Sequence, residues 1–356
     1  MHKKLLDIYS DYLIFQNQYA TATGLSRLLE GDISHDKITR FLNNNKKELG
    51  SKDLWRYVKP EVRKQEKEKG GIFIVDDTIE EKPYSKINDT ICWYYAHNKG
   101  RCIKGINILS CLVRYDDFAV PVSFETIKKD MHFCDIATKK EKRKSSVTKN
   151  ELLYQMLQRA VENDIKFEYV LADNWFGSRK NMEFINNEID KKFIIGMKSN
   201  RLIAFSEEEH KKGQHQNINT LTIKDEEIRE VWLKDLSFPV KLLKKVFKNG
   251  NGSVGTLYLV TNDFNLNADQ TYEIYKKRWR VEEYHKSIKQ NTSLARSPTK
   301  ISISQRNHIF ASIIAYCKLE FLSKKTTMNH FALKYKLILR ANQATYKELQ
   351  QMKLAA

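Results

Sequence analysis

The chain has 356 residues, and its 62 Lys and Arg outnumber its 44 Asp and Glu to give a net charge of +18. Hydrophobic residues make up 41% of the chain, which is compatible with a packed core. The length exceeds the roughly 100–150 residues of a usual domain, so more than one domain is predicted. No run of about 18 apolar residues is present, which excludes a transmembrane helix. The basic excess favours a polyanionic partner such as nucleic acid or an acidic membrane surface.

The cysteines and the first residues bear on the compartment. The five cysteines include no Cys-x-x-Cys pair, so neither a disulfide framework nor a zinc site is expected. The opening MHKKLLDIYSDYLIF lacks the apolar core and cleavage site of a signal peptide. We therefore expect a cytoplasmic protein.

Residues 1–70 are predicted to form a helical DNA-binding domain. Leucines at helical spacing in Thr21–Glu30, a Gly-Asp break and a capping Ser34 indicate two short helices that resemble a helix-turn-helix. In that arrangement Lys37 and Arg40 would contact DNA. A helical hairpin with solvated basic residues explains the pattern equally well. The charged segment 59–71 is expected to be a linker or frayed helix that ends the domain.

From residue 71 the pattern changes to strands. Residues 198–254 are polar and irregular, with isolated strands around Ile223–Leu233, and the run 139–144 (KKEKRK) is expected to be a solvated loop. The remaining predicted elements are strands at 71–77, 167–173, 191–197 and 255–263, a hairpin at 104–126, a helix at 151–163 and a long helix from Asn267.

Two aspartates close predicted strands, Asp76 after IFIV and Asp173 after EYVLA. Adjacent parallel strands end on one edge of a sheet, where ligands bind. Two carboxylates there repel each other unless a cation lies between them, and hard oxygen ligands suit Mg²⁺ or Mn²⁺. Strand-ending aspartates also cap turns, and that alternative stays open here. Asp77, one residue on, points to the other face of its strand and is the less favoured ligand.

The predicted helix 271–291 places four polar residues on one face. At 100° per residue, Tyr275, Arg278, Glu282 and Lys289 share an arc of about 60°, beside an apolar stripe that can pack on a sheet. Glu282 can supply a third carboxylate, while arginine and lysine suit phosphates. A solvated helix with ordinary charge pairs is the alternative.

The spacing Tyr-x₂-Arg-x₃-Glu-x₆-Lys, formed here by the four residues just named, resembles the motif of the insertion-sequence family-four transposases, a branch of the DDE transposases. Two further motifs of that family are Asp-Asp-Thr after a strand, similar to Asp76-Asp77-Thr78 here, and a strand followed by an aspartate, similar to LADNWFG with Asp173. The family also inserts a β-rich domain before the glutamate-bearing helix, which residues 198–254 resemble. The resemblance covers roughly residues 72–320.

The resemblance implies an α/β fold: an RNase H-like mixed sheet flanked by helices, with a β-rich insertion and an N-terminal helical domain. The core would comprise residues 71–197 and 255–325, followed by a short tail at 326–356. It implies two Mg²⁺ ions, replaceable by Mn²⁺, at Asp76, Asp173 and Glu282. Tyr275, Arg278 and Lys289 would hold DNA phosphates.

The implied activity is cut-and-paste transposition. Members bind the inverted repeats at transposon ends in double-stranded DNA, cleave through hairpin ends, and join the ends to target DNA. They act as a homodimer in a synaptic complex without a membrane partner, in a nucleoid-associated, prokaryotic setting. A metal-dependent nuclease without strand transfer and an inactive DNA-binding relic are the alternatives.

The sequence departs from the family at one aromatic position. Better-known members place a tryptophan before the helix to hold a flipped base, whereas here Tyr258, or Trp232 in the insertion, is left for that stacking role. His97 and His285 are expected to be structural, and Trp175 is expected to pack in the core.

Overall fold

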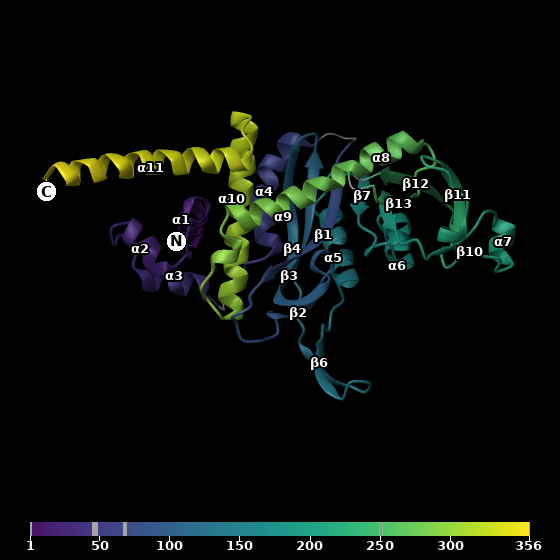
Figure 1. Ribbon diagram of the computed structural model, residues 1–356, viewed down its shortest axis with the longest axis horizontal. Helices are drawn as coiled ribbons and strands as arrows, with labels where there is room; N and C mark the ends of the chain where they lie inside the picture. Colours follow the sequence, from purple (N-terminus) through teal and green to yellow (C-terminus); the bar gives the residue numbers. More distant parts are fainter. Residues whose placement is uncertain (1, 45–48, 67–69, 249, 251, 356) are drawn as a thin grey trace.

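The computed structural model describes residues 2–355 except 45–48, 67–69, 249 and 251 (Figure 1). Its α-helices are α1 (His2–Phe15), α2 (Ala22–Leu28), α3 (His35–Leu42), α4 (Ser51–Gln65), α5 (Lys149–Glu162), α6 (Arg179–Glu183), α7 (Glu207–Lys211), α8 (Ala268–Lys276), α9 (Arg280–Asn291), α10 (Ser302–Thr326) and α11 (His330–Ala355). Its strands are β1 (Ile72–Glu81), β2 (Cys92–Ala96), β3 (Arg101–Tyr115), β4 (Phe118–Thr126), β5 (Met131–Asp135), β6 (Lys140–Lys144), β7 (Tyr169–Ala172), β8 (Lys192–Met197), β9 (Leu202–Ala204), β10 (Gln216–Asn217), β11 (Ile228–Leu233), β12 (Val240–Lys248) and β13 (Val254–Thr261).

One large mixed sheet organises the molecule. β1 pairs antiparallel with β3 and parallel with β7, β7 pairs parallel with β8, and β4 pairs with β3. The resulting order β4-β3-β1-β7-β8, with helices on both faces, is the RNase H-like arrangement that the family resemblance implies. The central position of β1 explains its continuous apolar run, because such a strand is buried on both faces.

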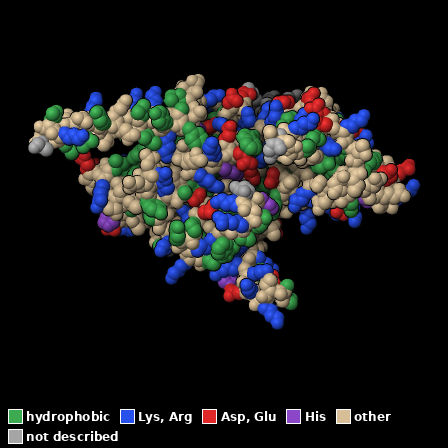
Figure 2. Space-filling model, in the orientation of Figure 1, with side chains coloured by type: hydrophobic (Ala, Val, Ile, Leu, Met, Phe, Trp, Pro, Cys, Tyr) green, Lys and Arg blue, Asp and Glu red, His purple; other side chains and the backbone are tan. Residues whose placement is uncertain are grey.

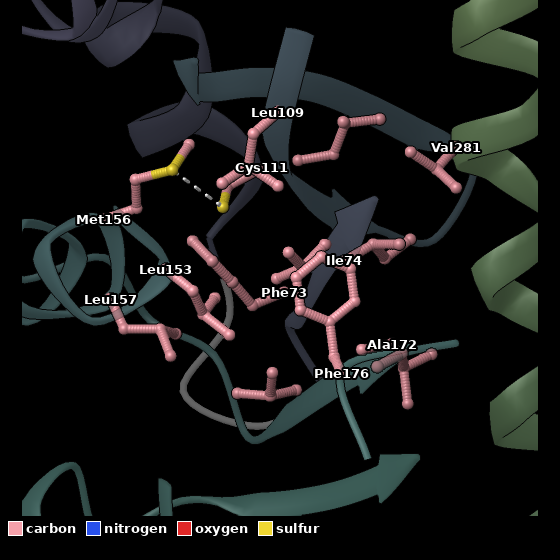
Figure 3. Packing of buried hydrophobic residues seen from close by; sticks show 14 of the residues in the cluster. Phe73, Ile74, Leu109, Cys111, Leu153, Met156, Leu157, Ala172, Phe176 and Val281 are labelled. Atoms are coloured by element: carbon pink, nitrogen blue, oxygen red, sulfur yellow. Dashed lines mark hydrogen bonds between the residues drawn. The ribbon is translucent and has the colours of Figure 1, made fainter. Parts of the chain in front are cut away.

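Helices α5 and α9 cover opposite faces of this sheet. Cys111 of β3 contacts Met156 of α5, with 3.8 Å between the sulfur atoms, whereas its neighbour Ser110 lies 3.3 Å from the hydroxyl of Tyr284 on α9. Successive strand residues point to opposite faces, so the two helices enclose the sheet. Figure 3 shows the packing around Phe73 of β1, with Leu153, Met156 and Leu157 of α5 nearby and Val281 on α9.

The sequence predicts that the first strand of the sheet ends at about Asp76, but β1 continues beyond this residue. It continues through Glu81, because β3 pairs with its whole length while β7 stops opposite Val75. Asp76 therefore lies at the point where one neighbouring strand ends and the other continues. Beyond Val75, β1 therefore has no partner on the β7 side, while β3 still pairs with it on the other side.

The segment 198–254 extends the same sheet. β8 pairs with β13, and the order continues through β12, β11 and β9 to β10. The sequence does not predict β12, because KLLKKVFK has too many lysines to indicate a strand. Pairing on both sides by β11 and β13 supplies the stability that its composition does not.

The N-terminal helices form a second apolar core with α10. Residues from α1, α2 and α3 pack against Ala311, Ala315 and Leu319, and the predicted cap is confirmed because Ser34 accepts from the amide of Lys37 at 3.4 Å. Helix α4 instead buries Leu54, Trp55, Val58 and Val62 in the main core. The expected linker 59–71 is thus helical as far as Gln65, and residues 67–69 lie outside the described residues.

Two further expectations need correction, and the tail adds one more helix. The run 139–144 is not a loop, because Lys140–Lys144 pairs as β6 with β5 in a hairpin that projects from the body (Figure 1). The single long helix is interrupted by a 3₁₀ turn at Lys277–Trp279 between α8 and α9. The tail forms α11, which extends away from the sheet. None of the helices in the described part of the chain has the length and apolar content of a membrane span.

Candidate active site

Asp76 and Asp173 lie side by side at the open edge of the sheet. Val75 of β1 and Ala172 of β7 are the last pair of residues between these adjacent parallel strands, and Asp76 and Asp173 come directly after them. Asp173 starts a turn in which its carboxylate accepts from the amide of Trp175 at 3.0 Å. Asp76 is opposite Ser110 in the β1–β3 ladder, so its side chain is on the face that α9 covers.

Helix α9 brings Glu282 to the same face. Arg278, in the 3₁₀ turn before it, lies between the two carboxylates: its Nη1 is 3.5 Å from Asp76 Oδ2 and 3.4 Å from Glu282 Oε1. The arginine also lies 5.7 Å from the ring centre of Tyr275, which is buried. Three of the four motif residues on this helical segment therefore lie together, and the turn between the helices orients Arg278 toward the acids.

The electrostatics of this cluster favour a bound cation. The pKa of Asp76 is raised to about 8 by burial and by the negative charges of Asp173 and Glu282, although the positive charge of Arg278 acts to lower it. Burial also raises the pKa of Asp173. One oxygen of Asp76, one of Glu282 and one ring nitrogen of His285 all lie within 4.8 Å of one another. Such a donor set fits a divalent metal, which would relieve the repulsion that raises these pKa values.

Two family models match the chain over this architecture. One, described as DDE superfamily endonuclease, matches residues 1–217, and the other, described as Transposase DDE domain, matches residues 131–318. The chain belongs to the DDE transposases. It is thus an enzyme of the nuclease type, in a class that typically uses divalent metals. No curated protein matches the chain significantly.

Other predicted residues of this DDE transposase lie elsewhere. Lys289 donates from α9 to Thr78 Oγ1 at 2.7 Å and to the Ile79 carbonyl at 3.0 Å, so its ammonium holds the helix to β1. Lys37 and Arg40 are exposed on α3, in the N-terminal cluster. All three stay predictions as DNA contacts.

The predicted stacking residues both lie in the extended part of the sheet. Tyr258 on β13 is only 8% exposed, so its ring faces are covered by protein, which argues against a base-stacking role. Trp232 on β11 is half-buried against His210, with ring centres 5.2 Å apart.

Asp77 is held on the opposite face, as its position one residue along the strand predicts. Its two carboxylate oxygens accept from Lys149 Nζ and from Asn107 Nδ2, each at 2.7 Å. The Lys149 ammonium also lies 4.2 Å from the ring centre of Trp175. Trp175 is 39% exposed, so the expectation that it packs in the core is wrong. The tryptophan instead covers the start of α5 beside Asp173.

A buried ionic network fixes the position of α9. Arg280, at the start of α9, donates to both carboxylate oxygens of Glu320 on α10, at 2.8 and 3.0 Å. His330 of α11 lies 2.9 Å from Glu320 and 2.9 Å from Ser287 of α9. The contacts join three helices on the side of α9 away from the carboxylates, so they set where Glu282 sits.

One supporting residue gives little signal in the sequence. Gly196 of β8 lies against the turn after Asp173, where an added Cβ would be 2.8 Å from the amide nitrogen of Asn174. The glycine therefore permits the close approach that positions the aspartate. A lone glycine in a predicted strand is the kind of signal that indicates such an approach.

Proposed function

We propose that this chain is a DNA transposase of the insertion-sequence family-four type. It binds transposon-end inverted repeats as a homodimer, cleaves them in a metal-dependent reaction that passes through hairpin ends, and joins the ends to target DNA. The observation that carries the proposal is the convergence of Asp76, Asp173 and Glu282 from three distant segments, with Arg278 between two of them. The Tyr-Arg-Glu-Lys spacing on the last segment supports the family assignment.

The three carboxylates are the proposed ligands of two Mg²⁺ ions. When bound, such ions supply an activated water or 3′-hydroxyl and neutralise charge on the leaving oxygen. The chain's own contribution is positioning. Asp76 is fixed in a strand that is paired beyond it, and Glu282 is fixed by the packing of α9. Arg278 is placed to contact a phosphate oxygen once a metal neutralises the carboxylates that it now pairs with.

The basic hairpin β5–β6 supports DNA as the partner. Lys140, Lys142 and Lys144 alternate along β6 and therefore point to one face of the hairpin. Figure 2 shows Lys and Arg side chains along this projection. The exposed ammonium groups suit phosphates of a strand that passes the body of the enzyme, and α3 offers a second basic surface with Lys37 and Arg40.

Strand cleavage on DNA that carries the inverted repeats flanking the encoding element tests the proposal. Wild type with Mg²⁺ should cut at the repeat ends, and Asp76→Asn and Glu282→Gln should abolish cutting while end binding survives. Asp77→Asn and Glu283→Gln are matched controls, because their carboxylates pair with Lys149 and Arg280 instead. Hairpin ends are read on a denaturing gel, and joining is read with a supercoiled target.

Each alternative gives a distinct result. Cleavage without dependence on repeat sequence, and without joining, would indicate a nuclease. Repeat binding without cleavage by any variant would indicate an inactive relic. Unchanged cleavage by Asp76→Asn and Glu282→Gln would contradict the site itself.

A further inference from the structure

His285 is the one member of the acidic cluster that the DDE motif leaves without a role. It lies three residues after Glu282, so the two side chains leave neighbouring positions on the same side of α9. The side chain is 7% exposed, and Nε2 is buried without a hydrogen-bond partner among the described residues. A buried polar atom without a partner costs free energy, so this nitrogen calls for an explanation.

The ring of His285 lies close to two of the carboxylates of the site. One ring nitrogen lies within 4.8 Å of an oxygen of Asp76 and of an oxygen of Glu282. A neutral imidazole is a common metal ligand in proteins.

The other buried histidines of α10 and α11 differ in this respect. His308 has partners on both ring nitrogens, the Tyr9 hydroxyl at 2.9 Å and the Ser293 carbonyl at 3.0 Å. His330 likewise lies between Ser287 and Glu320. Both ring nitrogens of each of these two histidines therefore have a hydrogen-bond partner. His285, next to the carboxylates, differs because its Nε2 has none among the described residues.

We propose that the imidazole of His285 is a ligand of the metal ion held between Asp76 and Glu282. This inference rests on the proposed function, since it concerns the same metal site. A nitrogen ligand suits Mn²⁺ better than the harder Mg²⁺, so the site should prefer Mn²⁺ more strongly than three carboxylates alone would. His285 is thus a binding residue, in contrast to the structural role expected from the sequence.

Pulsed electron paramagnetic resonance with Mn²⁺ alone as the probe tests this assignment. Untagged wild-type protein should show nitrogen modulation from a directly bound ¹⁴N nucleus. Protein grown with ¹⁵N-histidine should show the corresponding ¹⁵N pattern. Both signals should disappear in Asp76→Asn, which removes the shared carboxylate, and persist in His132→Gln, a matched change at an exposed histidine of the projecting hairpin.

His285→Gln should lose the nitrogen modulation while it still binds Mn²⁺, on the order of tenfold more weakly. The change in Mg²⁺ affinity should be smaller. The measurement on wild type decides the question even where this variant folds poorly. Mn²⁺ bound in an Asp76-dependent manner without nitrogen modulation would overturn the role of His285 alone. Failure of wild type to bind Mn²⁺ at all would overturn the metal site of the proposed function as well.

Discussion

Asp76 in the sheet and Asp135 in the projecting hairpin are the same side chain in opposite electrostatic settings. Burial beside Asp173 and Glu282 raises the pKa of Asp76 to about 8. The pKa of Asp135 is lowered to about 2, because it accepts hydrogen bonds from Lys142 and from the amide and hydroxyl of Thr138. The acidic site holds charge that the fold disfavours, whereas the hairpin holds charge that water and nearby donors already stabilise.

The difference separates two ways in which this protein holds charge. Buried carboxylates in the site repel one another until a cation arrives, and that repulsion is available to drive metal binding. The exposed lysines of the hairpin cost little free energy to keep charged, and their attraction for an anion is weakened by salt. Four substitutions test how far the two regions differ, and they are given in order of decreasing expected effect.

Breaking the buried network behind α9 should have the largest effect on stability. Glu320→Gln removes the buried carboxylate that Arg280 and His330 share and leaves Arg280 paired with Glu283 at the surface, and we expect a loss of about 3 kcal/mol in the free energy of unfolding. Urea denaturation followed by circular dichroism measures it. The same amide substitution at the hairpin, Asp135→Asn, should leave the denaturation midpoint unchanged. Equal effects at both positions would show that burial does not separate the two regions.

The pH dependence of the metal-free enzyme should reflect Asp76. Its pKa is higher in the folded than in the unfolded protein, so the folded state binds more protons between about pH 4 and pH 8 and stability falls as pH rises through that window. Asp76→Asn should remove this decline and should be more stable than wild type at pH 8 in EDTA, by about 1–2 kcal/mol. Thermal unfolding at pH 5 and pH 8 measures both effects. A parallel decline in wild type and variant would contradict the assignment.

The position of Asp173 should be sensitive to one methyl group. Gly196→Ala places a Cβ against the Asn174 amide, and we expect the resulting shift of the aspartate to lower the cleavage rate about tenfold, since small misplacements of catalytic groups are costly. Gly255→Ala on β13 is the control, because no atom lies within 4 Å of its added Cβ. Single-turnover cleavage measures both variants. A loss of the same size in the control would point to a general effect on the sheet.

The hairpin lysines should affect DNA affinity and not the fold. Replacing Lys140, Lys142 and Lys144 by Gln removes up to three phosphate contacts, so the slope of log affinity against log salt should fall by up to about 2.7. The unfolding transition should not move. Fluorescence anisotropy with a repeat-end duplex at several salt concentrations gives the slope. An unchanged slope would place the DNA away from the hairpin.

The sequence predicts those parts of the site in which a local pattern fixes the outcome. Apolar runs ending in Asp76 and Asp173 indicate buried neighbouring strands, and helical periodicity places Arg278 and Glu282 on one face. The pattern cannot show that β1 continues past Asp76, because pairing with β3 decides that. The strand order of the RNase H-like core is expected from the family resemblance and is confirmed by the pairing.

Residues set by contacts distant in sequence are the ones that the sequence misjudges. Trp175 is a large apolar residue of the kind usually found in a core, yet it is exposed and its ring covers the ammonium of Lys149. The sequence could not show this, because Lys149 lies at the start of α5 and is distant from Trp175 along the chain. The sequence also does not show that a ring nitrogen of His285 lies near Asp76 and Glu282, or that Lys289 donates to Thr78 of β1, because both contacts depend on how α9 packs on the sheet. β12 is a strand because its two neighbours pair with it, a fact absent from its own nine residues.

The dependence of the N-terminal helices on α10 has a consequence during translation. Helices α1, α2 and α3 bury their apolar faces against Ala311, Ala315 and Leu319, which follow them by about 270 residues. At about 5–20 residues per second, the ribosome delivers these partners on the order of 15–50 s after α3 has emerged. During that interval the apolar faces of α1, α2 and α3 lack their partners on α10 and are exposed to binding by a chaperone. Glu282 emerges only shortly before α10, so the N-terminal helices and the last of the three proposed metal ligands reach their native positions almost together.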